Sequence, residues 1–339
     1  MDEQVRPQLG IVDSLSLGFG MVARRPWLVI LPVLLDLLLW FGPSVSVRPL
    51  VSRFLPLLQM PPGSTEELQQ MATFSGEIIE QLGENWNLLT LLTRGMVSIP
   101  SFISSQLAPP TLWDAGVPLG VSSIGGALGM GLLAALVGTL LGGLYLALVA
   151  DHLERWHSDS EPDPDTEEDS LPGSFLQRLG KICVRLVLLA LLVLGGGLLV
   201  MVPVSVISGV LGVFSPSLAI GAVSLLSLLA VSLGLWVQFV LYFTTTAIVL
   251  DDVGVRQALW RSANVVWRNL WPTLGLVLLS YVIGTGFTLI WDRIAGTVWG
   301  TAAGILGTAY VGAALTAAGL AYYRDRRRHW QESLAPHSA

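Results

Sequence analysis

Six long runs of apolar residues constrain the fold of this chain more than any other feature. A transmembrane helix needs about 20 apolar residues to cross the hydrocarbon core of a bilayer, and these runs come close to or exceed that length. Only 12% of the 339 residues are charged and 53% are hydrophobic, so the chain has about half the charge of a soluble protein. We expect an all-α, polytopic membrane helical bundle of six transmembrane helices, at residues 26–44, 121–150, 183–213, 217–250, 271–291 and 299–323.

Two of these runs allow a more specific prediction. The fifth is the clearest span, because Trp271 and Trp291 bracket it at a separation of about 30 Å in a helix, which is the hydrocarbon thickness. The fourth, residues 217–250, is too long for one perpendicular crossing. It must tilt, break or continue beyond the membrane as a helix.

The distribution of basic residues predicts the orientation. If both termini and residues 151–180 and 251–270 are cytosolic, the inner side holds fourteen lysines and arginines, counting Lys181 and Arg185 beside the start of the third span, and the outer side holds only Arg48, Arg53, Arg94 and Arg293. Cytoplasmic segments of membrane proteins carry such an excess. The sequence therefore predicts a multi-pass protein of the plasma or inner cell membrane with both termini in the cytoplasm. The first run is not a cleavable signal, because it is long and contains Asp36.

Two segments outside the predicted spans differ in composition. Residues 158–173 are acidic, contain prolines and lack apolar periodicity, so we expect residues 151–180 to form a solvated cytosolic linker. Residues 45–118 contain a helix-capping pair, Ser64 and Glu67, with apolar residues at helical spacing after it. A short apolar run, residues 86–99, follows. We predict an external helical insertion that caps the spans or lies on the outer leaflet.

Residues 251–270 have the pattern of a helix in the membrane interface. Leu259 and Val266 fall on an apolar face, and tryptophans occupy its boundary with a face that carries arginines. An amphipathic helix packed on a protein core would show the same pattern, but the direct continuation into a span favours the interface. The residues predicted at the membrane interface along the chain are Trp27, Trp260, Trp267, Trp271, Trp291, Arg261 and Arg268.

The N-terminal segment repeats this pattern. A shift of 244 positions superimposes Leu15 on Leu259, Gly18 on Ser262, Val22 on Val266, Arg24 on Arg268 and Trp27 on Trp271. Residues 172–186 form a weaker copy before the third span. We therefore predict three helical hairpins, each preceded by an amphipathic cytosolic helix.

Residues 244–271 also support a family resemblance. The acidic–glycine junction is followed by a pattern that resembles a bacterial family of six-span membrane proteins, which includes the membrane domain fused to some glycerophosphodiester phosphodiesterases. The residues that carry it are Leu250, Asp251, Gly254, Ala258, Leu259, Ser262, Arg268, Asn269 and Trp271. The long insertion and the acidic linker depart from that family, and no catalytic phosphodiesterase domain follows. The resemblance implies an architecture and no activity.

The sequence contains no constellation of residues typical of an enzyme. The histidines lie in the predicted cytosolic flanks, and His152 and His157 are five positions apart, off a common helix face, so we expect no metal site and no cofactor. Glycine-rich stretches lie inside the predicted spans, where pairs four residues apart favour close helix packing. These pairs are Gly125 with Gly129 and Gly138 with Gly142.

Asp36 is the one acidic residue in the interior of a predicted span. It lies eleven residues after Arg25, about 16 Å deep and near the bilayer midplane, where a charge is costly and marks a candidate functional site. The functional interpretation is a proton, cation or substrate site. The structural interpretation is a hydrogen bond to a neighbouring helix, through Gln238, Tyr281 or Thr285. The sequence leaves both open.

From these observations we derive three candidate functions, in order of preference. The first is a non-catalytic binding, scaffold or envelope-homeostasis component; the second is a permease for a small or lipid-like solute that uses Asp36; the third is a membrane-embedded enzyme. The predicted partner is the lipid bilayer, with anionic headgroups on the cytosolic side. The basic residues 324–328 favour lipid over nucleic acid because they follow a span. A membrane-protein partner or a homo-oligomer is left open.

Overall fold

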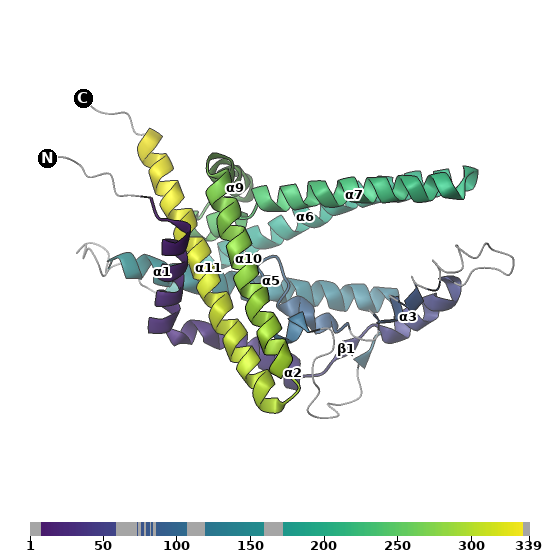
Figure 1. The fold of residues 1–339 in the computed structure, drawn as a ribbon, viewed down its shortest axis with the longest axis horizontal. Helices are drawn as coiled ribbons and strands as arrows, with labels where there is room; N and C mark the ends of the chain where they lie inside the picture. The colour runs from purple at the N-terminus through teal and green to yellow at the C-terminus, as the bar shows by residue number, and fades with distance from the viewer. Residues whose placement is uncertain are drawn as a thin grey trace. The chain divides into compact units, whose positions relative to one another are not determined.

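Helices form almost all of the structure (Figure 1). The computed structural model describes residues 8–58, 73, 76–77, 79–81, 83, 86–106, 119–158 and 172–334. Within these residues the only strands are one parallel pair of two-residue strands, β1 and β2. The prediction of an all-α protein is therefore confirmed. The predicted helix after the capping pair at Ser64 falls largely outside the described residues, as does most of the acidic linker.

The described elements, in chain order, are α1 (Ile11–Arg24), η1 (Pro26–Val29), α2 (Ile30–Phe41), β1 (Val45–Ser46), α3 (Arg48–Phe54), η2 (Leu55–Leu58), η3 (Leu88–Leu92), η4 (Ile103–Ser105), β2 (Leu119–Gly120), α5 (Ile124–Ser158), α6 (Pro172–Phe214), α7 (Pro216–Val240), α8 (Thr244–Asp251), α9 (Val255–Arg268), α10 (Leu270–Ile294) and α11 (Val298–Leu334). The η elements are short 3₁₀ helices.

Five helices are long and apolar enough to cross a membrane: α5, α6, α7 with α8, α10 and α11. Half of the apolar window of α5 and of α11 is buried, whereas α6, α7 and α10 bury 6%, 0% and 11% of theirs. Helices that are apolar on all sides and unburied by protein require an apolar solvent. These five candidate spans indicate a multi-pass membrane protein.

The first predicted span, residues 26–44, is shorter in the structure than we expected. It consists of η1 and α2, which together cover Pro26–Phe41 and form an apolar helix of fewer than 18 residues. At 1.5 Å per residue these 16 residues reach about 24 Å, short of a bilayer core. Gly42 is extended and ends α2. The sequence predicts six spans, and the described residues form five long apolar helices and one shorter apolar helix.

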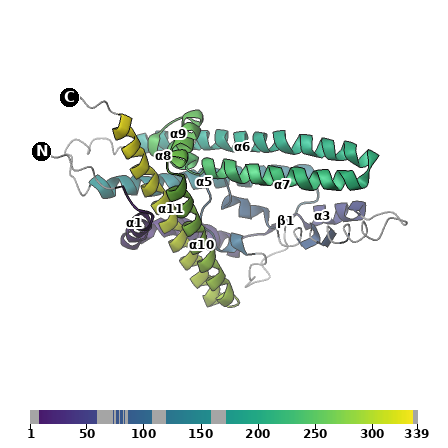
Figure 2. The ribbon, with the colours of Figure 1, turned by 45° about the horizontal axis from the view of Figure 1, so that its top comes forward.

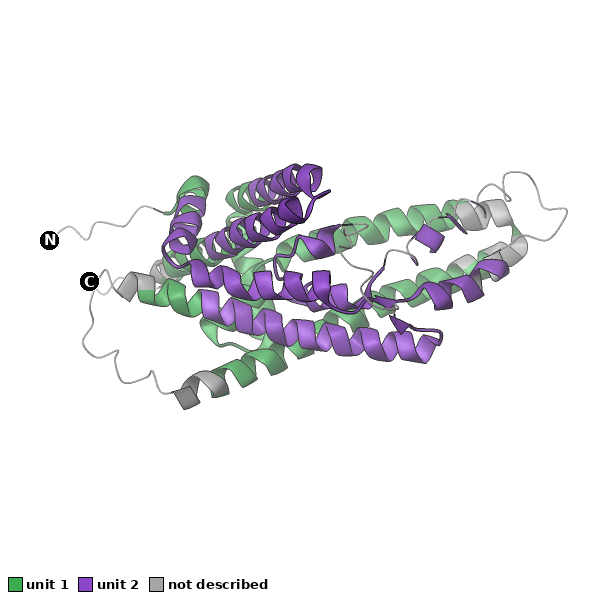
Figure 3. Cartoon of the chain, turned by 90° about the horizontal axis from the view of Figure 1, so that it is seen from below, with its two compact units in different colours: residues 1–14, 150–277, 319–339 green, residues 15–149, 278–318 purple. Residues whose placement is uncertain are grey.

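The chain forms two compact units (Figure 3). Unit 1 comprises residues 1–14, 150–277 and 319–339, and unit 2 comprises residues 15–149 and 278–318. The boundaries fall inside α1, α5, α10 and α11, so each of these helices contributes to both units.

Unit 1 contains a long hairpin of α6 and α7, which lie side by side (Figure 2). The long fourth apolar segment breaks after α7, at residues 241–243, and resumes as α8. Phe243 at this break is fully buried and its ring stacks on that of Tyr322, with 5.8 Å between the ring centroids. The aromatic contact anchors the break against α11, within unit 1.

Asp251, at the end of α8, is the centre of an ionic cluster in unit 1. Its side chain is 0% exposed and forms ion pairs with Arg261 of α9 and Arg327 of α11. Tyr323 of α11 donates a hydrogen bond of 2.9 Å to Asp251 Oδ2. Asp252 then takes a left-handed conformation, with φ at 48°, which Asp tolerates better than most residues. The acidic–glycine junction therefore joins α8, α9 and α11.

Helices α1 and α9 have equivalent bounds under the shift of 244 positions. Four of their buried positions also coincide: Ser14, Gly18, Met21 and Val22 in α1, and Ala258, Ser262, Val265 and Val266 in α9. A proline follows the end of each helix, Pro26 two residues after Arg24 and Pro272 four residues after Arg268, and its ring fits the first turn of a new helix. The structure thus gives the two segments the same local form.

The third predicted copy differs. Residues 172–186 are continuous with the following span in the 43-residue helix α6, and no proline separates the two parts as Pro26 and Pro272 do elsewhere. The predicted linker is also narrower than residues 151–180, because α5 continues to Ser158 and α6 begins at Pro172. Helix α11 likewise continues through the predicted tail to Leu334.

Candidate functional site

Residues 86–106 form an irregular segment inside unit 2, which we call the inner segment. It contains the short helices η3 and η4 and no longer helix. Phe102 and Ile103 are 0% and 2% exposed, and they pack in a cluster with Leu39 and Trp40 of α2 and Ile305 of α11. Irregular backbone at membrane depth is stable only where protein buries it. The segment is therefore packed between helices, whereas we expected it in an external cap.

Glycines on α5 and α11 make room for the inner segment. A Cβ atom at Gly138 would lie 2.8 Å from Leu92 Cα, and one at Gly142 would lie 2.8 Å from Val97 Cβ. On α11, a Cβ at Gly304 would lie 2.7 Å from the Phe102 ring. Gly138 and Gly142 thus serve close packing as predicted, but against the inner segment. Gly125 and Gly129 have no atom within 4 Å of such a Cβ.

Asp36 holds the inner segment on α2. The carboxylate is fully buried and accepts hydrogen bonds from the Ser101 hydroxyl and from the backbone N–H groups of Phe102, at 2.8 Å, and Ile103, at 3.3 Å. Three donors around one carboxylate satisfy a group that would otherwise be very costly to bury. The contacts are those of a structural acceptor.

A chain of hydrogen bonds continues from Asp36 to Arg94. Ser101 Oγ donates to Asp36 and accepts from the backbone N–H of Ser104 at 3.1 Å. The Arg94 guanidinium donates to the backbone carbonyl of Ser104. Two serines therefore connect the buried acid to the cation, and both oxygens of the acid accept hydrogen bonds from neutral donors.

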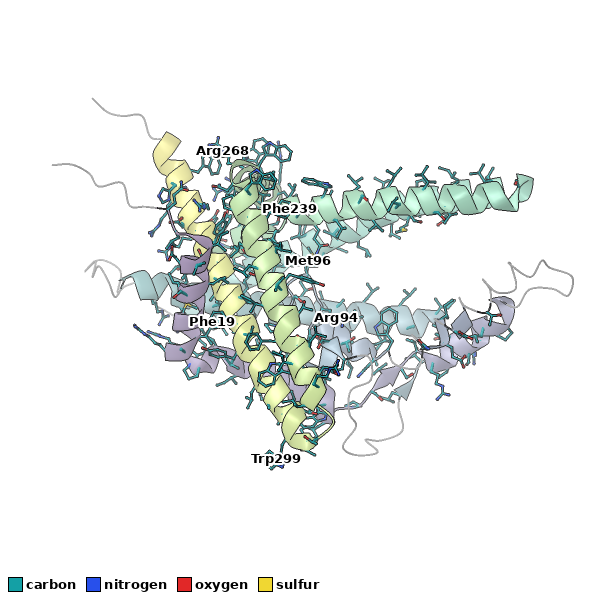
Figure 4. The ribbon with its side chains drawn as sticks, viewed as in Figure 1. Phe19, Arg94, Met96, Phe239, Arg268 and Trp299 are labelled. Carbon is teal, nitrogen blue, oxygen red and sulfur yellow. The ribbon has the colours of Figure 1, made fainter. Side chains whose placement is uncertain are left out.

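A cavity of about 260 Å³ lies next to this chain. The inner segment provides Arg94, Ser98 and Ser101 to its wall, and α10 and α11 provide Thr288 and Thr308 together with apolar groups such as Phe287. Thr308 Oγ1 is buried and has no hydrogen-bond partner. All of these residues belong to unit 2. Figure 4 marks Arg94 on the inner segment.

Two candidate spans, α10 and α11, line the cavity at positions between their middle and the turn that joins them. Thr288 is six residues from the end of α10 and Thr308 is ten residues from the start of α11, so both are about 10–15 Å from the intervening turn. Trp299 at that turn is 84% exposed (Figure 4), as is typical of a membrane–water interface. On insertion scales, a cation near the middle of a transmembrane helix costs about 2.5–3.5 kcal/mol unless water or a partner solvates it.

The polar residues suggested as partners of Asp36 lie elsewhere. Gln238, Tyr281 and Thr285 are exposed, Tyr281 by 67%, and the hydrogen bonds of the Asp36 carboxylate go to residues 101–103 instead. The physical reason is the position of the inner segment, which occupies the space beside Asp36. A charged ligand role for Asp36 stays a prediction.

The predicted interface residues fall into two groups. Trp260, Trp267 and Trp271 are 68%, 71% and 77% exposed, which the interface assignment requires. Trp27 is exposed by 36%. In contrast, Trp291 packs against the core cluster of unit 2 and its indole nitrogen is buried without a partner.

The arginines expected to face lipid phosphate mostly bind protein groups. Arg261 and Arg327 pair with Asp251, Arg326 donates to Gln8 and to the Leu9 carbonyl, and Arg324 donates to the Leu153 carbonyl. The guanidinium of Arg268 lies 5.5 Å from the centre of the Trp330 ring. The amphipathic pattern of α9 thus reflects packing on protein as well as any contact with lipid.

Sequence reasoning missed Arg94 as a site residue, because it counted Arg94 among the basic residues of an external insertion. A signal was present in the length of the run at residues 86–99. An apolar run of 10–14 residues is too short to cross and is typical of a buried or re-entrant segment. Within the described ranges no group of three or more His, Cys, Asp or Glu could hold a metal ion.

Comparison with known proteins identifies a family. A family profile described as a domain of unknown function, DUF7847, matches residues 88–322, which run from the inner segment through most of α11. No curated protein and no solved structure matches the chain. Because the match covers well over half of the 339 residues, the chain belongs to the DUF7847 family.

Proposed function

We propose that this chain is a non-catalytic membrane protein that binds a small ligand in the cavity of unit 2. The observation that carries the proposal is a wall that combines Arg94, several hydroxyl groups and apolar side chains. Such a mixture of a few polar groups in an apolar cavity is typical of ligand sites. The wall includes no histidine, cysteine or carboxylate, so it offers binding groups without a general base.

The proposal includes an orientation. Residues 1–25, 151–180 and 324–339 would be cytosolic and residues 45–118 would begin and end outside, which the fourteen-to-four distribution of basic residues supports. Strands β1 and β2 pair Val45 with Leu119, so the two ends of the insertion meet on one side. The inner segment would then enter from the outer side and return to it.

The resemblance to the membrane domain fused to some glycerophosphodiester phosphodiesterases belongs to the same proposal. It rests on the acidic–glycine junction and on Ser262, whose hydroxyl donates to the Val240 carbonyl and accepts from the N–H of Phe243. These are architectural contacts. They support a shared membrane fold and carry no catalytic role.

A permease is the second candidate, favoured by one observation. Irregular backbone packed between spans is a feature of transporter sites, and the inner segment connects a buried acid to a cation through Ser101 and Ser104. If Asp36 couples proton movement to transport, Asp36→Asn should abolish pH-gradient-driven uptake in vesicles and leave binding intact. Uptake at the parent rate in that variant would rule out this role.

The binding proposal is tested with purified full-length protein and native mass spectrometry of its bound small molecules. Ser98→Trp places an indole in the cavity, because Ser98 lines it. Leu228→Trp is the matched control, since Leu228 is 63% exposed on the apolar surface of α7. We expect a bound ligand in the parent and in the control and none in Ser98→Trp. A ligand retained in Ser98→Trp, or none in the parent, would contradict the proposal.

A further inference from the structure

We propose that the ligand of this cavity carries an oxyanion, a phosphate or carboxylate group, on an amphiphilic molecule. This inference rests on the proposed binding function and adds the chemical class of the ligand. It begins with Arg94, which is the one charged residue in the wall of the cavity. A guanidinium has five N–H donors in a planar fork, and the Ser104 carbonyl takes one of its amino groups. Arg94 is an exposed residue, so its remaining donors are open to a ligand that enters the cavity.

Among the described residues that line the cavity, none is a carboxylate that could pair with Arg94. The nearest acid along the hydrogen-bond chain is Asp36, and its oxygens already accept from Ser101, Phe102 and Ile103. An arginine in a cavity wall that contains no carboxylate matches a planar oxyanion, which guanidinium groups bind in bidentate geometry.

Some hydroxyl groups in the cavity wall donate hydrogen bonds to the backbone, and one has no hydrogen-bond partner. Thr288 donates to the Gly284 carbonyl and Ser105 to the Phe102 carbonyl, so both are committed to backbone. Thr308 Oγ1 is buried with no partner and lines the same cavity as Arg94. Buried hydroxyls without a partner are rare and call for an explanation. A ligand oxygen between Arg94 and Thr308 provides one.

The apolar part of the wall indicates an amphiphile. Ile99, Phe287 and Val311 line the cavity together with the polar groups. On α10, Leu289 and Ile290 next to the cavity residues are 61% and 57% exposed, so an acyl chain leaving the cavity would meet an apolar surface. A volume of about 260 Å³ is below that of pockets for whole drug-sized molecules, and it suits a headgroup whose tail stays in the bilayer.

The experiment compares three probes: phosphatidylglycerol, phosphatidylcholine and inorganic phosphate. Full-length protein is delipidated in neutral detergent, each probe is titrated, and bound probe is counted by native mass spectrometry. We expect stoichiometric binding of phosphatidylglycerol, at least about tenfold tighter than that of phosphatidylcholine, because only the former leaves a net negative charge for Arg94. If inorganic phosphate alone binds tightly, the cavity selects an oxyanion, but the ligand is a soluble molecule and not a lipid.

Variants separate this site from general attraction of anionic lipid. Arg94→Gln should weaken phosphatidylglycerol binding about tenfold, Arg94→Lys should recover part of the loss, and Thr308→Val should weaken it several-fold. Arg293→Gln is the matched control, because Arg293 is exposed at the end of α10 and does not line the cavity. Arg293→Gln should bind as the parent does.

Two outcomes overturn the inference, and they differ in what they say of the proposed function. If both lipids bind equally and Arg94→Gln changes neither, while Ser98→Trp still removes them, the cavity binds a ligand but does not select an oxyanion. If no probe binds and the parent carries no ligand, both the inference and the proposed function are wrong. Thr308→Val keeps the test valid if Arg94→Gln does not fold.

Discussion

Two aspartates, Asp36 in unit 2 and Asp251 in unit 1, are buried by different means. Asp36 accepts from a serine hydroxyl and two backbone N–H groups. Asp251 accepts from two arginines and a tyrosine. Removing an acceptor that has only neutral donors leaves those donors unsatisfied. Removing the acid of an ion-paired cluster leaves buried positive charges without a counter-charge. The two residues therefore respond differently to replacement.

The loss of stability on replacing Asp36 should increase with the number of hydrogen-bond donors that are left without an acceptor. Asp36→Asn keeps one oxygen for the N–H of Phe102, and its amide can donate to Ser101, so we expect a loss of about 1–2 kcal/mol. Asp36→Leu leaves three buried donors unsatisfied and should cost at least about 3 kcal/mol. Thermal unfolding in detergent measures both. A Leu variant as stable as the parent would mean that Asp36 does not hold the inner segment.

Asp251 can be compared with its neighbour Asp252. Asp251→Asn leaves Arg261 and Arg327, which are 19% and 27% exposed, without their counter-charge, so we expect a loss of about 3 kcal/mol. Asp252→Asn removes a more exposed pair with Arg185, at 46% and 23% exposure, and should cost less than about 1 kcal/mol. Equal effects on thermal stability would contradict the assignment of Asp251 as the centre of the cluster.

At the scale of elements, local signals in the sequence predicted some helices well. Trp271 and Pro272 at one end and Trp291 at the other bracket α10, and the shift of 244 positions predicts that α1 and α9 have the same form. The inner segment could not be predicted in this way. Its position depends on contacts with residues that are distant in the sequence, such as Asp36, Gly138 and Gly304. No local periodicity encodes these contacts.

The two glycine pairs of α5 provide an element-scale test. A Cβ at Gly138 would lie 2.8 Å from Leu92 Cα, so Gly138→Ala should destabilise the protein by about 1–3 kcal/mol through overpacking. Gly129 has open space around it, and Gly129→Ala should be neutral or stabilising by up to about 1 kcal/mol because alanine favours helix. Thermal unfolding compares them. The packing assigned to α5 is wrong if both variants behave alike.

At the scale of the whole molecule, composition alone predicted the class of protein. A charged fraction of 12% and long apolar runs leave no solution other than helices in a membrane. The number of complete spans did not follow from the sequence, because hydropathy does not distinguish the short helix α2 from a complete span. Gly42 ends the apolar helix that precedes the insertion.

The orientation is tested by labelling single cysteines in intact cells, in a Cys183→Ser background. The predicted orientation makes a cysteine at Ser64 react with a membrane-impermeant reagent from outside, because Ser64 lies in the insertion. A cysteine at Ser160, in the acidic linker, should react only after the membrane is opened. Labelling at Ser64 from the cytosolic side alone would reverse the topology.

The measurement that tests the account most directly is a disulfide between the inner segment and α5. The N–H of Met96 donates a hydrogen bond of 3.4 Å to Thr139 Oγ1, so the two residues are neighbours, and cysteines at positions 96 and 139 should cross-link on mild oxidation in native membranes. Position 96 paired with position 129 is the control, because residue 129 is about 15 Å from 139 along the helix. We predict a bond in the first pair and none in the second. No bond in the first pair would place residues 86–106 outside the helices and contradict the site.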